Sequence, residues 1–192
     1  MITITSTFDT PVGPITAIHD EAIYLLKWQG INFEPERNRL LRMFPHLDIK
    51  ESSQAIWGDE TNRLHAVRND LHHWLDEYFE KGGAGWPRAL PAMHLEGYNG
   101  VQREVYRRLL NWTMPGETYS YKGLGEMKTD EDIHPTSVAC ALHSCLLDVL
   151  IPTHRVLSRD GKLIRYPGGL WRKKYLLDIE AKAAGPNQKQ MP

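Results

Sequence analysis

A long amphipathic segment, residues 62–81, is the feature that most constrains the fold. Its apolar side chains recur every three or four residues and therefore line one face of an α-helix. They are Leu64, Val67, Leu71, Trp74, Leu75, Tyr78 and Phe79. The glycine-rich run 82–85 follows directly and ends the helix. We interpret His65, His72 and His73 as solvated helix positions and expect no metal site.

Short strands precede this helix. Alternating apolar residues on both sides of a Pro- and Gly-containing turn predict a β-hairpin over residues 3–18. Three further elements are expected before residue 62: a strand at 22–28, a short helix at 33–44 and an edge strand at 46–52. Residues 86–96 are typical of an extended linker, and a domain boundary is expected near Gly97–Gly100.

The second half is mainly helical. Helical spacing predicts helices at residues 101–112, 122–128, 137–145 and 170–184. Pro135 and the hydroxyl of Thr136 suit the start of the third helix, with Thr136 as its cap. Helix, loop and short helix in this order form a helix-turn-helix arrangement. We therefore expect a first domain of residues 1–97, a second of residues 98–184, and a disordered tail over residues 185–192.

The composition is that of an ordinary globular protein, with 24% charged residues and a net charge of −1. Residues 1–100 hold 9 basic and 14 acidic side chains, whereas residues 101–192 hold 14 basic and 10 acidic ones. The mildly basic second half is compatible with a polyanionic partner. No apolar stretch approaches the ~20 residues of a membrane helix, and the start has no signal-peptide pattern. These absences, together with two cysteines that form no disulfide framework, favour an intracellular protein without membrane contact. The sequence does not distinguish the nucleus from the cytoplasm.

The hexapeptide 151–156 is the most informative short stretch. Pro152 ends an apolar run and favours an extended backbone before it, so the next side chains emerge at a turn. There Thr153, His154 and Arg155 place a hydroxyl, an imidazole and a permanent cation side by side. By itself the stretch fits either a turn with a chance polar triplet or a reactive site.

The order of such motifs along the chain resembles the O6-alkylguanine-DNA alkyltransferase family, also called methylated-DNA–protein-cysteine methyltransferases. The resemblance covers nearly the whole chain. Its motifs are the turn 10–16, Leu75–Phe79, Val101–Tyr106, Pro115–Tyr121, the hexapeptide 151–156, Gly161-x-Leu163, Tyr166-x-Gly168-Gly169-Leu170 and Lys174-x-x-Leu177-Asp178-x-Glu180. Each motif is weak alone, but their shared order and spacing favour a site over a chance triplet.

The resemblance implies an α+β fold. An N-terminal domain with an antiparallel sheet and a helix would precede a mainly helical, winged-helix-like helix-turn-helix domain that carries the site. Proteins of this family approach the minor groove of DNA and rotate the damaged guanine into a pocket, where a cysteine thiolate takes the alkyl group. The resemblance thus implies double-stranded DNA as partner, no cofactor and a monomer.

The resemblance also implies roles for individual residues. Thr153 occupies the nucleophile position, His154 would act as a base through water, and Glu180 would orient that imidazole. The base pocket would consist of Tyr121, Val156, Leu163, Tyr166, Pro167 and Gly168, with Tyr121 also displacing a phosphate. The DNA-binding residues would be Thr136, Ser137, Ala139, Ala141 and Arg155, and Ser144 is a further small residue of the same helix.

This chain departs from the family pattern at the nucleophile. A hydroxyl is far less acidic than a thiol and is a poor nucleophile at an alkyl carbon, so we expect no alkyl transfer to Thr153. Thr136 also stands where the family has an intercalating arginine, Cys145 where it has a hinge asparagine, and Arg165 where it has a glycine. The acidic residues 130–132 would repel phosphates if they faced DNA. Cys140 and Cys145 are better interpreted as buried or half-buried structural residues than as a relocated nucleophile.

Four functions fit these observations. The protein binds DNA, with O6-alkylguanine recognised by base flipping, and serves as a damage sensor or adaptor for another repair protein. Alternatively, it is an inactive interaction module that does not need DNA. A third reading is an active methyltransferase whose cysteine was replaced at position 153. A fourth function is hydrolysis, in which His154 and Glu180 would activate a water molecule. No specific feature of the sequence supports it.

Overall fold

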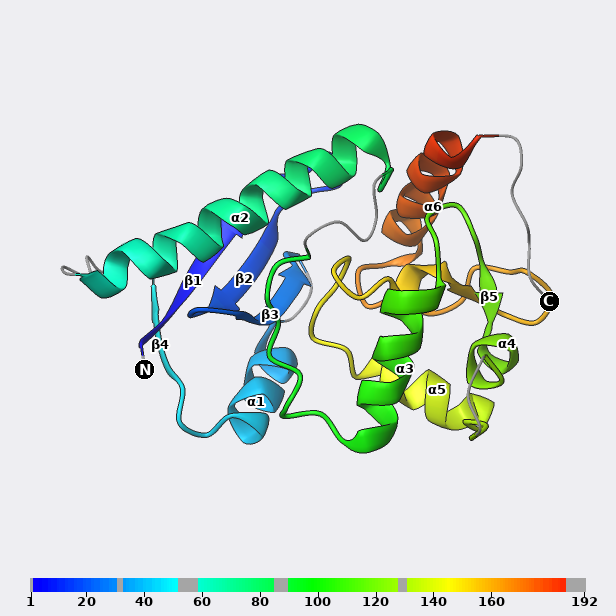
Figure 1. Cartoon of the computed structure of the whole chain (residues 1–192), viewed down its shortest axis with the longest axis horizontal. Coiled ribbons are helices and arrows are strands. Elements are labelled where there is room, and N and C mark those ends of the chain that lie inside the picture. Colours follow the sequence, from blue (N-terminus) through cyan, green and yellow to red (C-terminus); the bar gives the residue numbers. More distant parts are fainter. Residues whose placement is uncertain (1, 31–32, 52–58, 85–89, 128–130, 186–192) are drawn as a thin grey trace. The chain divides into compact units, whose positions relative to one another are not determined.

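The computed structural model describes residues 2–30, 33–51, 59–84, 90–127 and 131–185 (Figure 1). The chain forms two compact units. The first comprises Met1–Glu77, Ala89–Gly97 and Leu146–Leu150, and the second comprises Tyr78–Arg88, Tyr98–Cys145 and Ile151–Pro192. Residues 186–192 of the predicted tail 185–192 and part of the predicted linker lie outside the described residues, and the division after residue 97 stays a prediction.

A four-stranded sheet is the centre of the first unit. Its strands are β1 (Ile2–Phe8), β2 (Ile15–His19), β3 (Ile23–Trp28) and β4 (Asp48–Glu51), in the order β3-β2-β1-β4. The hairpin and the antiparallel pairing of β1, β2 and β3 confirm the prediction. β4 differs, because it pairs parallel to β1. The helix α1 (Glu34–Met43) between β3 and β4 lets the chain reverse twice, and β4 therefore enters the sheet in the direction of β1.

The long helix α2 (Asp59–Lys81) runs along one face of this sheet (Figure 1). Its predicted apolar face is confirmed, since Leu64, Leu71 and Leu75 are buried. The three histidines of α2 are exposed, as expected, and His72 stacks on Phe8 with 5.7 Å between the ring centroids.

The segment Leu146–Leu150 belongs to the first unit although it follows the second half of the chain. The backbone N–H of Leu26 donates to Leu146 O (2.7 Å), and that of Asp148 donates to Leu26 O (2.8 Å). A buried ion pair joins Lys27 Nζ to Asp148 Oδ1 at 2.9 Å. Strand β3 therefore fixes the chain just before the hexapeptide begins.

The second unit consists mainly of helices. They are α3 (Gly100–Trp112), α4 (Tyr121–Gly125), α5 (Pro135–His143) and α6 (Leu170–Ala184), together with a 3-10 turn, η1 (Thr153–Arg155). The strands β5 (Tyr119–Ser120) and β6 (Val156–Leu157) pair in parallel. A capping box starts α3: Asn99 Oδ1 accepts from the N–H of Gln102, and Gln102 Oε1 accepts from the N–H of Asn99.

The start of α5 differs from the prediction. Its cap is His134, whose Nδ1 accepts from the N–H of Thr136 at 3.3 Å, and not Thr136 itself. Pro135 has a fixed φ that suits the first helical position, so the helix starts two residues earlier than predicted and Thr136 lies inside the first turn.

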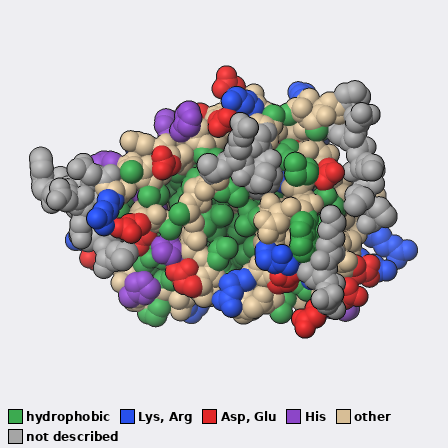
Figure 2. Space-filling view, in the orientation of Figure 1, with side chains coloured by type: hydrophobic (Ala, Val, Ile, Leu, Met, Phe, Trp, Pro, Cys, Tyr) green, Lys and Arg blue, Asp and Glu red, His purple; other side chains and the backbone are tan. Residues whose placement is uncertain are grey.

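None of the described helices combines the length and apolarity that crossing a bilayer requires. Acidic and basic side chains are interspersed on the face that Figure 2 shows, so no single-sign patch dominates that face.

Candidate active-site network and adjoining cavity

The side chain of Glu180 is the centre of the candidate site. It projects from α6 and is fully buried. His154 Nε2 lies 2.9 Å from Glu180 Oε1, and Arg155 donates from Nη2 to Oε1 (2.8 Å) and from Nε to Oε2 (2.9 Å). The hydroxyl of Tyr78, at the end of α2, donates to Oε1 at 2.7 Å. The 3-10 turn η1 places His154 and Arg155 on the same carboxylate.

Glycine is required at position 116 to complete this network. The N–H of Gly116 faces Glu180 Oε2 at 3.4 Å, and its φ is +83°. A Cβ at this position would lie 2.6 Å from the Cβ of Ala184. The carboxylate thus receives hydrogen bonds from two buried side chains of η1, from Tyr78 and from the backbone, which is sufficient to satisfy a buried charge.

These contacts set the protonation states. Burial by itself would raise the pKa of Glu180. The charge that His154 gains at acidic pH, the permanent charge of Arg155 and the hydrogen bonds of both residues hold that pKa well below its usual range. Burial lowers the pKa of His154 below 6.5, although Glu180 opposes that shift. Because Arg155 already balances the carboxylate, we take His154 as neutral at pH 7. The ionised Glu180 cannot donate, so Nε2 carries the proton of His154 and Nδ1 has a free lone pair.

Thr153 and His154 each have one buried polar atom without a hydrogen bond among the described residues. These atoms are Thr153 Oγ1 and His154 Nδ1. Buried polar atoms are normally paired, so these two atoms are candidates for contact with water or a bound group. A neutral imidazole with a free lone pair beside a nucleophile position is the arrangement of a general base.

Thr153 also lines a cavity of about 360 Å³. The other lining residues are Tyr121, Ala139, Leu142, His143, Arg165, Tyr166 and Pro167. The structure therefore brings together Tyr121, Tyr166 and Pro167 of the predicted pocket with Thr153, the predicted nucleophile position. The predicted pocket residues Val156, Leu163 and Gly168 do not line it.

Val156 and Gly168 instead lie in the loop beside the cavity, and their carbonyls accept hydrogen bonds from side chains of α6. Val156 is fully buried in β6, where its carbonyl accepts from Lys173 Nζ at 2.6 Å. Lys173 Nζ also donates to Ile164 O at 2.9 Å, and burial lowers its pKa to about 8. Gly168 O accepts from Arg172 at 3.0 Å. Helix α6 thus fixes the loop 156–169 by side-chain donors to backbone carbonyls.

The predicted DNA-binding residues separate into two groups. Thr136 is exposed, and Ser137 and Ala139 are partly exposed, so all three are accessible on α5. Ala141 is 1% exposed, so its side chain is not accessible for the predicted contact with DNA, and its carbonyl accepts from the hydroxyl of Tyr106 at 2.8 Å. Arg155 is fully buried on Glu180, so its predicted DNA contact is wrong as well.

Ser144, Cys140 and Cys145 lie in the second half of α5 and directly after it. Ser144 is buried and its hydroxyl donates to Ala141 O at 2.9 Å. Cys145 is buried, as predicted, but Cys140 is exposed and the prediction of a buried cysteine there is wrong. Neither cysteine lines the cavity next to Thr153.

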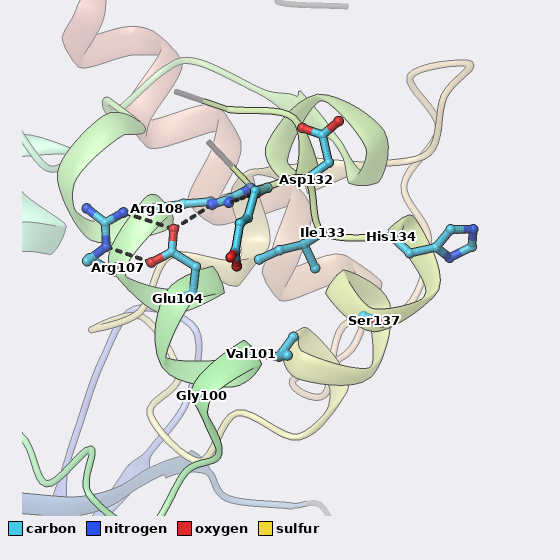
Figure 3. Close-up of a pocket in the computed structure, with 10 residues that line it drawn as sticks. Gly100, Val101, Glu104, Arg107, Arg108, Asp132, Ile133, His134 and Ser137 are labelled. Carbon is cyan, nitrogen blue, oxygen red and sulfur yellow. Dashed lines mark hydrogen bonds and ion pairs between the residues drawn. The ribbon is translucent and has the colours of Figure 1, made fainter. Parts of the chain in front are cut away.

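A second cavity, of about 590 Å³, lies between the start of α3 and the start of α5 (Figure 3). Two of the three acidic residues from the sequence analysis, Glu131 and Asp132, line it; Asp130 lies outside the described residues. Arg108 is fully buried there, donating to Glu104 Oε1 (2.8 Å) and Glu131 O (2.8 Å) and to the carbonyl of Gly125. Arg108 therefore holds the acidic segment beside α5.

Several residues of the site were not predicted from the sequence. Tyr78 was interpreted as part of the apolar face of α2, and only its position at the end of the helix distinguishes it. Lys173, Leu142 and His143 carry no local signal. Arg165 was noted only as a departure from a family pattern, yet it lines the cavity.

Comparison with known proteins agrees with this geometry. The family model described as "6-O-methylguanine DNA methyltransferase, DNA binding domain" matches residues 100–182. The methylated-DNA–protein-cysteine methyltransferase of Shigella flexneri is 30% identical over 173 residues, which are 89% of this chain and 91% of that protein. The chain belongs to the methylated-DNA–protein-cysteine methyltransferase family.

Further relatives support the assignment. The methyltransferase of this name from Thermococcus gammatolerans is 31% identical over 79% of this chain and 82% of that protein. The crystal structure of Mycobacterium tuberculosis OGT in complex with DNA has a TM-score of 0.67, with 22% identity and 94% of each chain covered. That structural likeness confirms the mixed α/β fold of the methyltransferase family.

Proposed function

We propose that the protein binds double-stranded DNA and accepts an O6-alkylated guanine in the cavity beside Thr153 without taking its alkyl group. One observation carries this proposal: the His154–Glu180–Arg155 network is complete, but the adjoining residue of η1, Thr153, carries a hydroxyl. A thiolate is a soft nucleophile suited to an alkyl carbon, whereas a hydroxyl paired with a base acts mainly in acyl or phosphoryl transfer. The site is thus suited to binding and not to reaction.

The cavity supports recognition of a rotated base. Tyr121 and Tyr166 supply aromatic surface, and the lining residue Thr153 carries an unpaired Oγ1; the next residue, His154, carries an unpaired Nδ1. Flipped bases are recognised by stacking on such side chains and by hydrogen bonds to their edges. Because no alkyl group is transferred, the protein releases the lesion unchanged, and we assign it the role of a damage sensor or adaptor for another repair protein.

Binding to damaged DNA is the first expected result. A duplex with one O6-methylguanine is expected to bind at least about 10-fold more tightly than the same duplex with guanine, and both are expected to bind more weakly at higher salt. Fluorescence anisotropy at two salt concentrations measures both effects. Equal affinity for the two duplexes would contradict damage recognition.

Tyr121 provides a point test of the cavity. Tyr121→Ala is expected to abolish the preference for O6-methylguanine while binding to undamaged DNA persists, because Tyr121 lines the cavity. Tyr175→Ala is the matched control: Tyr175 is also half-buried in the second unit but does not line the cavity. A preference retained in Tyr121→Ala would show that the base enters elsewhere.

A DNA-independent interaction module is the second candidate function. The observation that favours it is the cavity of about 590 Å³ beside α5, where Glu131 and Asp132 place negative charge near the helix that should approach DNA. If salt-dependent DNA binding is absent at both salt concentrations, this function replaces the first.

A further inference from the structure

We propose that Arg165 forms a phosphate-binding site at the mouth of the cavity, where it holds a backbone phosphate of the nucleotide whose base enters. This inference rests on the proposed function and deepens it. It assigns to Arg165 the positioning of the extruded nucleotide.

Arg165 has the position that such a role requires. Its side chain lines the cavity with Tyr121 and Tyr166, yet the residue is exposed, so it lies at the rim. Its charge acts on Tyr121: burial raises the pKa of Tyr121, and the Arg165 guanidinium partly opposes that shift. A rotated base enters a pocket while its phosphates stay in the strand outside. A rim residue beside Tyr121 is therefore close to where those phosphates must pass.

The guanidinium of Arg165 is available for a ligand. Within the described parts of the chain, its side chain makes no hydrogen bond or ion pair. Of the residues that line the cavity, Arg165 alone carries a permanent charge, and none is acidic; His143 is the other basic group. An unpaired arginine in a site without carboxylates attracts an anion, and its planar fork matches two phosphate oxygens.

The backbone of Arg165 supports the same conclusion. Its φ is +34°, in the left-handed region that residues with a Cβ disfavour. Glycine would adopt this conformation without strain. Strained residues persist where the surrounding structure fixes them, and they cluster at ligand-binding positions. The loop 156–169 thus holds Arg165 in a strained backbone conformation, with its side chain at the mouth of the cavity.

The phosphate is favoured over the lesion itself as ligand. A group on the guanine O6 atom must approach Thr153, which is 4% exposed, whereas Arg165 is exposed at the rim. The start of α5, which is expected to approach DNA, presents Thr136 and no cation there. Among the residues that line the cavity, Arg165 therefore supplies the fixed positive charge for the entering nucleotide.

Arg165→Gln tests the site directly. Binding of this variant to the O6-methylguanine duplex is expected to be about 10-fold weaker at low salt. The slope of log affinity against log salt is expected to fall by ~0.9, the value for one phosphate contact. Arg165→Lys is expected to keep the slope while losing part of the affinity, because lysine retains the charge but not the fork.

Two controls separate this site from general charge and from folding. Lys182→Gln removes one exposed positive charge from the last turn of α6, ~18 Å along the helix from its first residue. It should change neither affinity nor slope by a comparable amount. Arg165→Gly is expected to weaken binding without lowering the unfolding temperature, because glycine relieves the positive φ.

The outcomes are distinct for the two proposals. If the unchanged protein prefers the damaged duplex but Arg165→Gln binds it with the same affinity and slope, the phosphate site is wrong and the proposed function stands. A loss of binding accompanied by a lower unfolding temperature in both Arg165→Gln and Arg165→Gly would also overturn it, since Arg165 would then be structural. If the unchanged protein has no preference for damage, the proposed function fails first.

Discussion

Glu180→Gln is expected to destabilise the protein by roughly 3–5 kcal/mol, the usual effect of breaking a buried ion pair. The substitution preserves the shape of the side chain but removes its charge, so the fully buried Arg155 loses its counter-ion. An amide nitrogen also cannot accept the hydrogen bonds that Tyr78, His154 and Arg155 make to the carboxylate. For a chain of this length, such a loss lowers the unfolding temperature by about 10 °C.

Asp178→Asn is the matched control for this prediction. Asp178 lies on the same helix, its side chain is 50% exposed, and it pairs with Lys174 at 2.6 Å on the surface. Exposed pairs of this kind contribute little, so the control should unfold within about 2 °C of the unchanged protein. Similar unfolding temperatures for Glu180→Gln and the unchanged protein would show that the network does not stabilise the fold.

The same carboxylate predicts how stability depends on pH. The pKa of Glu180 is lowered in the folded state, so between its folded and unfolded pKa values the unfolded chain binds more protons. The stabilisation is therefore fully present above the ordinary glutamate pKa and is lost as pH falls through the lower folded value. His154, whose pKa burial lowers, adds to the loss below about pH 6.5. Denaturant titrations between pH 3 and 7 should show a shallower pH dependence in Glu180→Gln.

The elements of the fold follow largely from local patterns. Alternating residues predicted the hairpin, and three-to-four spacing predicted α2, α3 and α6, because each pattern reports which side of an element is buried. The parallel pairing of β4 depends on where α1 returns the chain, and no residue of β4 encodes it. The cap of α5 depends on the orientation of the His134 ring, whose Nδ1 accepts from the N–H of Thr136.

The site was harder to predict than the fold. The hexapeptide indicated Thr153, His154 and Arg155, but a cation next to a histidine was interpreted as a DNA contact. Only the tertiary structure shows that Arg155 turns inward to Glu180, 25 residues further along the chain. Tyr78 lies even further away in sequence, and its hydroxyl meets Glu180 only because the end of α2 belongs to the second unit.

Thr153→Cys is expected to convert a protein without alkyl transfer into one that takes about one alkyl group per molecule. The introduced thiol would occupy the position of Thr153 Oγ1. The next residue is His154, whose Nδ1 is unpaired. A neutral imidazole with a free lone pair can take the thiol proton, and the resulting thiolate attacks the alkyl carbon while guanine leaves. Intact mass and peptide mapping after incubation with an O6-methylguanine duplex, or with an excess of a free O6-alkylguanine base, measure the transfer.

The comparison must isolate sulfur as the cause. The exposed Cys140 is therefore replaced by serine in every variant, so that label on a surface thiol is not counted. In this background Thr153→Ser should stay unlabelled, because it removes the β-branch of threonine but keeps a hydroxyl. Adding His154→Asn to Thr153→Cys should slow labelling by ~100-fold or more, the usual effect of losing a general base. Label on Thr153 in the otherwise unchanged protein would show that a hydroxyl suffices here. An unlabelled Thr153→Cys protein that still binds the damaged duplex would show that the cavity holds the base at a distance from which position 153 cannot react.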